Sequence, residues 1–210
     1  MSYTITNGYA TLAEYKAWIA VWGLSGGVGT DTSDDDVLSE LIESVSRFFD
    51  QETGCIFYKE SADATRYYTP ISTISVKIDD MASVTSVSVD YEGLRRSYTA
   101  LTVDVDYELL PYNASLTGKP YNELAIIPTL SSKYFPLVTK GLRVVGKAGY
   151  PSVPKDIHGA VMATVQSFNA NRAGQTNAGK ITVTSGGIVI RPEDVPTWAL
   201  EVIKHYRNRT

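Results

Sequence analysis

The chain contains 210 residues, of which 43% are hydrophobic and 20% charged, so disordered and fibrous classes are excluded and one large domain, or a domain with an insertion, is expected. The formal net charge of −4 argues against tight nucleic-acid binding, which needs clustered Lys and Arg. The start MSYTITNGYATLAEY lacks signal-peptide features, and no run reaches the about 18 apolar residues of a membrane-spanning helix. Cys55 has no partner for an internal disulfide, so a reducing cytosol is expected.

The charges are distributed unevenly along the chain. Residues 1–63 carry 3 basic and 11 acidic side chains, residues 64–139 carry 6 and 8, and residues 140–210 carry 10 and 4. The front is therefore acidic and the back is basic. This pattern is typical of a solvated surface, but such a chain can also pair with copies of itself or with a charged partner.

The first predicted element is a helix over residues 11–22, in the segment TLAEYKAWIAVWG. Its apolar face consists of Leu12, Tyr15, Ile19 and Trp22. The following segment, GLSGGVGTDTS, is expected to be a loop. Its glycines match neither the Walker spacing nor the G-x-G-x-x-G spacing, so no phosphate-binding loop is predicted.

An acidic cluster in DTSDDDVLSELIESVSRFFDQETGC opens a second predicted helix, residues 34–53. Apolar residues recur at helical spacing after the cluster. Ser33 or Asp34 can cap the free amides, and Asp35 and Asp36 then lie in the first turn, where the helix dipole favours negative charge.

The alternative for this cluster is a metal site. A calcium-binding loop that begins at Asp31 needs Gly and Glu at the positions that Asp36 and Ile42 occupy, so the cluster predicts a helix start instead. Gly54 is expected to end the helix in a left-handed conformation. Cys55, next to apolar neighbours, is interpreted as a small buried residue.

The middle of the chain is rich in strand signals. The candidate strands are ATRYYTP, TISVKID, VTSVSVDY, YTALT, DYELLPY, NELAIIP and GLRVVGKAGY, and DYEGLRR is typical of a hairpin tip. Tyrosines are frequent here, and either a sugar- or peptide-binding face or ordinary strand and interface packing explains them. They are Tyr67, Tyr68, Tyr91, Tyr98, Tyr107, Tyr112 and Tyr121.

Helical patterns return toward the end of the chain. PKDIHGAVMATVQSFNANR predicts a helix over residues 155–172, and PTWALEVIKHYRNRT predicts one over residues 195–208. Between them lies a Gly-rich flexible loop at residues 174–187, with a hairpin-like pair, ITVT and IVIR. Basic residues crowd the last turns, where the helix dipole favours them.

These elements predict an α+β fold, a bundle of about four helices with an inserted β-rich lobe. The expected parts are residues 1–55 and 151–210 for the bundle and residues 56–150 for the lobe. His158 and His205 belong to no metal-binding or catalytic motif, and no nucleophile, base and orienting group can be assembled. We therefore expect no catalytic, cofactor-binding or metal-binding residues.

The order of several segments resembles a known family. They are YATLAEYKAWI, DDDVLSELIESVSRFFDQETGCIFY, TRYYTP, DDMASVTSVSVD, DYELLPYN, LRVVGKAGYPSVPKDIHGAV and EVIKHYR. Together they cover about residues 9–207 and resemble the head-to-tail adaptor, or head-completion, proteins of long-tailed DNA bacteriophages. The most telling pieces are the second helix that runs into Gly-Cys-aromatic and the passage GKAGYPSVPKDI from a strand into a helix.

The resemblance implies a structural virion protein without enzymatic activity or cofactor. Such adaptors are assembled in the host bacterial cytoplasm and form a ring in the neck, matching the twelvefold portal and extending the DNA channel. Partners would be the portal protein, neighbouring copies and a stopper or tail-completion protein; DNA would pass without sequence-specific binding, and no membrane is involved.

Two sets of interface residues follow from the resemblance and the charge pattern. The terminal segment of family members docks on the portal, which points to Trp198, Val202, Tyr206, Arg207 and Arg209. A core helix with a solvated basic end is the alternative for that segment. In a ring, an acidic front can pair with a basic back, which points to Asp35, Asp36, Arg143 and Lys147.

Two other classes of function stay open. A ligand-binding module would use the tyrosine-rich lobe to recognise a glycan or a peptide. A metal-dependent hydrolase would use the acidic front, and it would lose stability in chelator.

Overall fold

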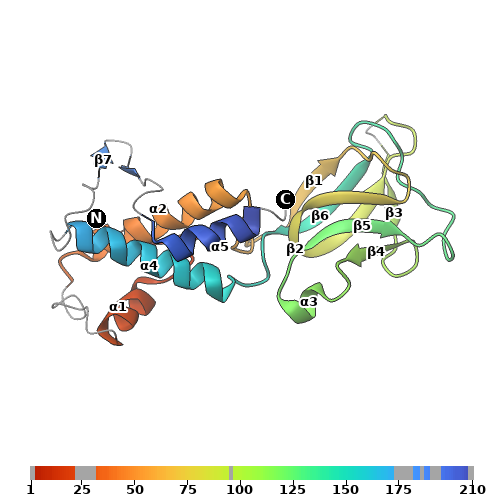
Figure 1. The fold of residues 1–210 in the computed structure, drawn as a ribbon. Helices are drawn as coiled ribbons and strands as arrows, with labels where there is room; N and C mark the ends of the chain where they lie inside the picture. Colours follow the sequence, from red (N-terminus) through yellow and green to blue (C-terminus); the bar gives the residue numbers. More distant parts are fainter. Residues whose placement is uncertain are drawn as a thin grey trace. The chain divides into compact units, whose positions relative to one another are not determined.

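The computed structural model describes residues 3–21, 32–94, 97–172, 182–184, 187–189 and 195–207. The chain forms two compact units, Met1–Cys55 with Val153–Thr210 and Ile56–Ser152, which we call the helical unit and the β unit. Helices dominate the first and an antiparallel sheet the second (Figure 1), so the predicted α+β class is confirmed.

In its described residues, the helical unit contains the helices α1 (Leu12–Val21), α2 (Asp35–Thr53), α4 (Lys155–Arg172) and α5 (Thr197–Arg207). Their bounds lie within two residues of those predicted. Helices α2, α4 and α5 pack against one another, and α1 packs on α2. The buried apolar faces include Tyr15, Ile19, Ile42, Phe49, Ile157, Val165, Phe168 and Ile203.

Local sequence explains where two of these helices begin and end. At the start of α1, the Glu14 carboxylate accepts hydrogen bonds from the Thr11 amide and hydroxyl at 2.8 Å, and the Glu14 amide donates back to the Thr11 hydroxyl at 3.2 Å. At the end of α2, Gly54 has φ of 73° and its amide donates to the Asp50 carbonyl, which confirms the predicted left-handed end.

Parts of several predictions lie outside the described residues: Trp22 of the first helix face, most of the loop GLSGGVGTDTS, Arg95 and Arg96 of the segment DYEGLRR, most of the Gly-rich loop at 174–187, and Arg209. The predicted hairpin within that loop is confirmed, because β7 (Thr182–Thr184) pairs antiparallel with β8 (Gly187–Val189).

The β unit contains β1 (Ala64–Tyr68), β2 (Ser75–Val89), β3 (Thr99–Leu101), β4 (Tyr107–Leu110), the short helix α3 (Ala114–Thr117), β5 (Tyr121–Ile126) and β6 (Leu142–Ala148). The strand order is β1-β6-β2-β5-β4, with β3 beside β2, and the strand pairs are antiparallel. The short helix α3 was not predicted, because its four residues are too few to show a helical period.

The sequence prediction divided β2 into two strands, at 73–79 and 84–91, and this was wrong. A single strand runs through, and it stays paired with β6 by shifting register between Met81 and Ser83 and between Val84 and Ser86. Such bulges break the alternation from which the strand was predicted. Gly146 makes the close approach possible, since a Cβ there would lie 2.2 Å from the Ser83 carbonyl oxygen.

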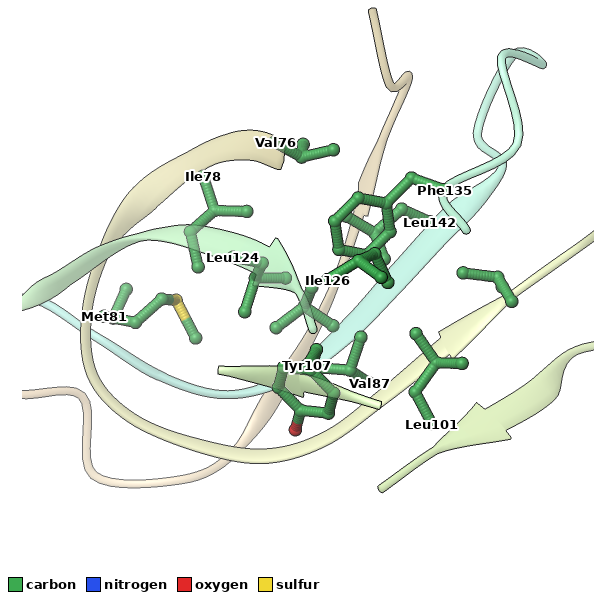
Figure 2. Packing of buried hydrophobic residues seen from close by; sticks show 13 residues of the cluster. Val76, Ile78, Met81, Val87, Leu101, Tyr107, Leu124, Ile126, Phe135 and Leu142 are labelled. Atoms are coloured by element: carbon green, nitrogen blue, oxygen red, sulfur yellow. The ribbon is translucent and has the colours of Figure 1, made fainter. Parts of the chain in front are cut away.

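One hydrophobic core fills the concave side of this curled sheet (Figure 2). Its fully buried members include Met81, Val87, Leu124, Phe135 and Leu142. Figure 2 shows these side chains converging from β2, β5, β6 and the segment between β5 and β6. The opposite, convex side of the sheet is thereby left to face solvent or a partner.

Candidate interaction surfaces

Helix α5 divides the residues that the sequence assigned to portal docking. Trp198 is 48% exposed and Val202 is half-buried, whereas Tyr206 is only 5% exposed. The Tyr206 hydroxyl donates to the Asp156 carboxylate of α4, at 3.0 Å to Oδ1 and 3.1 Å to Oδ2. Tyr206 therefore anchors α5 to α4, and Trp198 is the large aromatic residue that α5 presents on the surface.

Arg207 also bonds within the helical unit. Its Nε donates to the Glu52 carbonyl at 2.7 Å, and its guanidinium pairs with the Glu52 carboxylate. In this conformation the basic end of α5 is tied to the C-terminal turn of α2. Trp198 lies against α4, because a Cβ at Gly159 would be 3.8 Å from the Trp198 ring.

The acidic front forms the start of a helix. Asp35 pairs with Lys16 of α1, and Asp36 Oδ1 accepts the Tyr3 amide at 2.8 Å. Glu43 accepts the Thr6 amide at 2.9 Å, so the N-terminal segment runs along α2.

The acidic and histidine side chains are dispersed in the part of the chain that the structure describes. The described residues contain no group of three or more His, Cys, Asp or Glu side chains that could hold a metal ion. His158 Nε2 lies 3.7 Å from Glu14, whose pKa is lowered mainly by the hydrogen bonds from Thr11 that start α1. That carboxylate therefore has a structural role.

Cations and tyrosine rings gather on the convex face of the sheet. The register places Tyr67 of β1 and Ser88 of β2 on either side of Arg143 of β6, so their side chains share one face. Arg143 Nε donates to Ser88 Oγ at 3.0 Å, and its Cζ lies 4.5 Å from the centre of the Tyr98 ring.

Two lysines extend this group. Lys140 Nζ lies 5.7 Å from the Tyr67 ring centre, and Lys147 Nζ donates to the Ser61 carbonyl at 2.9 Å. Arg143, Val145 and Lys147 occupy alternate positions of β6 and are partly exposed, whereas the other residues of the strand are buried. We call Lys140, Arg143 and Lys147, with Tyr67 and Tyr98, the basic strip. Within the described part of the chain, none of its three cations forms a salt bridge.

The tyrosines that the sequence analysis named, from Tyr67 to Tyr121, do not form one binding face. Tyr107 is buried, which raises its pKa to about 12, and Tyr68, Tyr91 and Tyr121 pack against the core. Burial, with the Asp79 carboxylate nearby, also raises the pKa of Tyr68. Packing therefore explains most of the tyrosines.

Sequence reasoning missed an apolar surface at one end of the β unit. The β1–β2, β2–β3 and β5–β6 connections are joined there: the Phe135 amide donates to the Thr73 carbonyl at 2.9 Å, and the Tyr91 and Tyr134 rings lie 4.9 Å apart. Large hydrophobic side chains on these connections are 49–94% exposed, namely Ile71, Ile74, Leu94, Leu130, Tyr134 and Leu137. Isolated apolar residues in loops give no periodic signal, so only their exposure in the folded chain reveals them.

No family model matches this sequence, and no curated protein matches it. Among solved structures, a chain of "Neck of empty GTA particle computed with C6 symmetry" is similar over 97% of this chain and 92% of its own, with 14% identity and a TM-score of 0.53. A chain of "Virion of native gene transfer agent (GTA) particle" aligns over 99% and 94%, with 15% identity and a TM-score of 0.48. The first likeness shows a shared fold across both units. No helix among the described residues is both long and apolar enough to cross a bilayer.

Proposed function

We propose that this chain is a structural protein of a virion neck, an adaptor that forms a ring between the capsid portal and the tail and extends the DNA channel. The observation that supports it best is a fold shared over 97% of the chain with a chain from the neck of a gene transfer agent particle. The order of sequence segments independently resembles the head-to-tail adaptors of long-tailed phages.

In this proposal the chain has no enzymatic activity, and its assembly takes place in the host cytoplasm. The helices form a bundle completed by residues 151–210, and the β unit is a lobe inserted into it. Neighbouring copies, the portal protein and a stopper or tail-completion protein are the partners. Twelve copies would match a twelvefold portal. A ring of twelve is also compatible with the C6 symmetry with which the similar neck particle was computed, because a twelvefold axis includes a sixfold axis.

Trp198 is the proposed contact with the portal. It is a large aromatic side chain, 48% exposed on α5, and such residues are frequent anchors at protein interfaces. Tyr206 and Arg207, which the sequence also assigned to docking, contact the portal in this proposal only if α5 leaves Asp156 and Glu52. The simplest proposal therefore gives the first contact to Trp198 and half-buried Val202.

The test is co-sedimentation of the purified chain with portal rings from the same genome neighbourhood, followed by negative-stain imaging. The expected result is one added ring at the narrow end of the portal. Trp198→Ala should weaken binding by about tenfold or more, as expected for an interface anchor. Tyr112→Ala, in the β unit and 66% exposed, is the matched aromatic control and should bind like the wild type.

A folded chain that stays monomeric at high concentration and binds no portal would contradict the adaptor role. Equal binding by the two variants would remove Trp198 from the interface while leaving the adaptor role intact.

A further inference from the structure

The geometry points to a specific contact between copies: the basic strip of one β unit binds the acidic N-terminal half of helix α2 in the next copy. This inference rests on the proposed ring and names the surfaces that would close it. On the acidic side, Asp35 is no longer among the proposed contact residues, because it already pairs with Lys16 of the same chain.

The three cations of the basic strip have fixed positions, and they form no ion pair with a carboxylate of the described residues. Arg143 is held between Ser88 and the Tyr98 ring, and Lys140 lies over Tyr67. Arg143 donates to the Ser88 hydroxyl and Lys147 donates to the Ser61 carbonyl. Both acceptors are uncharged, so these hydrogen bonds do not neutralise the positive charges. Asp63, which precedes β1, accepts the Thr85 hydroxyl at 2.6 Å. An ordered cation that is only partly desolvated suits a fixed carboxylate partner.

The helical unit has the complementary excess of negative charge. Asp36 and Glu43 accept uncharged backbone amides, which leaves their charge in place, and half-buried Glu40 forms no ion pair within the described residues. Asp35 differs from these three acids, because its charge is paired with that of Lys16. Residues 1–55 as a whole hold two basic and nine acidic side chains.

Two different complementary surfaces on one chain give a head-to-tail contact. Such a heterologous contact repeats from copy to copy and closes into a ring when the rotation between copies allows it. Like-charge surfaces repel, so the same pattern also disfavours the pairing of two β units or two helical units. A second copy is therefore favoured over DNA as the occupant, and a chain of net charge −4 would also repel phosphates.

The test uses paired charge reversals in the full chain. Arg143→Glu and Glu40→Lys should each lower the association between copies by about tenfold or more, since each places like charges in contact. Mixing the two variants should restore assembly. The strip of Arg143→Glu can then bind the helix of Glu40→Lys, and the native strip of Glu40→Lys can bind the native helix of Arg143→Glu. An alternating ring with an even number of copies is then expected.

Assembly is measured by sedimentation velocity and negative-stain imaging, with and without portal rings. Lys119→Glu carries the same charge change on an exposed residue outside the strip and should assemble like the wild type. Lys147→Glu is a second strip variant should Arg143→Glu fail to fold, and a thermal melt checks each variant.

The outcomes separate the two levels of the proposal. If the wild type forms no ring alone or on portal, the adaptor role and this contact are both overturned. If rings form and the reversals change nothing, or mixing fails to restore assembly, only this contact is overturned. If the wild type binds a short DNA duplex and Arg143→Glu abolishes that binding, the strip is a nucleic-acid surface instead.

Discussion

Arg207 near the end of α5 and Glu52 near the end of α2 are joined twice, by the Arg207 Nε hydrogen bond to the Glu52 carbonyl and by the ion pair between their side chains. The carbonyl belongs to the last turn of α2, where backbone oxygens lack helical partners. A cation at that position also interacts favourably with the helix dipole. The basic end of α5 therefore stabilises the helical unit.

Arg207→Ala should lower the free energy of unfolding of the helical unit by about 1 kcal/mol, because the pair is half-exposed and one hydrogen bond is lost with it. Urea denaturation followed by tryptophan fluorescence measures this directly, since Trp18, Trp22 and Trp198 all belong to that unit. Lys204→Ala is the control: its pair with Glu201 is more exposed, and its loss should be barely measurable. An equal loss of unfolding free energy in the two variants would show that the contact with Glu52 stabilises the unit no more than an exposed ion pair does.

Tyr206→Phe should destabilise the helical unit by roughly 1.5 kcal/mol, because a partly buried hydroxyl loses a charged acceptor, Asp156, while the ring still fills its place. The same urea experiment applies. Tyr112→Phe also removes a hydroxyl bonded to a carboxylate, that of Glu108, but at an exposed site, so its effect should be close to zero. An unchanged midpoint for Tyr206→Phe would mean that α5 is not anchored through this hydroxyl.

The helices and most strands could be predicted from the sequence because their signals are local. The apolar stripe of α2, its acidic first turn and Gly54 lie within about 20 consecutive residues, and they agree with one another. Strand β2 could not be predicted as one element, because its two register shifts depend on the pairing with β6 and on Gly146, about 60 residues away.

The surroundings of the proposed interface residues could not be read from the sequence for the same reason. Arg143 and Lys147 could be selected from charge, but their position beside Tyr67 and Tyr98 depends on the register of three strands. The sequence assigned Tyr206 to portal docking. A helical period places a residue on a side of the helix without showing which neighbour, here Asp156, covers that side.

Gly149→Ala should destabilise the β unit by about 3 kcal/mol or more, because two costs combine. Its φ of 92° is unfavourable for any residue with a Cβ, and that Cβ would lie 1.7 Å from the Tyr58 carbonyl oxygen, so the backbone must move. Gly118→Ala isolates the first cost: φ is 65° and nothing lies within 4 Å, so about 1 kcal/mol is expected.

Hydrogen exchange followed by mass spectrometry of peptides from β6 and the preceding connection distinguishes these variants. Gly149→Ala should lose protection throughout the β unit, whereas Gly118→Ala should change it only slightly. Similar protection in both variants would mean that the approach of Tyr58 to Gly149 is looser than the structure indicates.

Glu60→Gln should destabilise the β unit at neutral pH and have progressively less effect in acid. Burial opposes ionisation of Glu60, but hydrogen bonds from the Arg66 guanidinium and the Ala148 amide outweigh it, so its pKa lies below the ordinary value of 4.5. A carboxyl whose pKa is lowered by folding stabilises the folded state above its unfolded pKa, and this stabilisation is lost as the pH falls through the folded pKa. The difference in stability between wild type and Glu60→Gln, roughly 1.5 kcal/mol at pH 7 for a charged hydrogen bond, should therefore be constant above about pH 5 and shrink below pH 4.5. Thermal melts of both proteins from pH 7 down to pH 3 measure this difference in stability. If the difference stayed constant across this range, the charge of Glu60 would not be what holds the segment before β1 against β6.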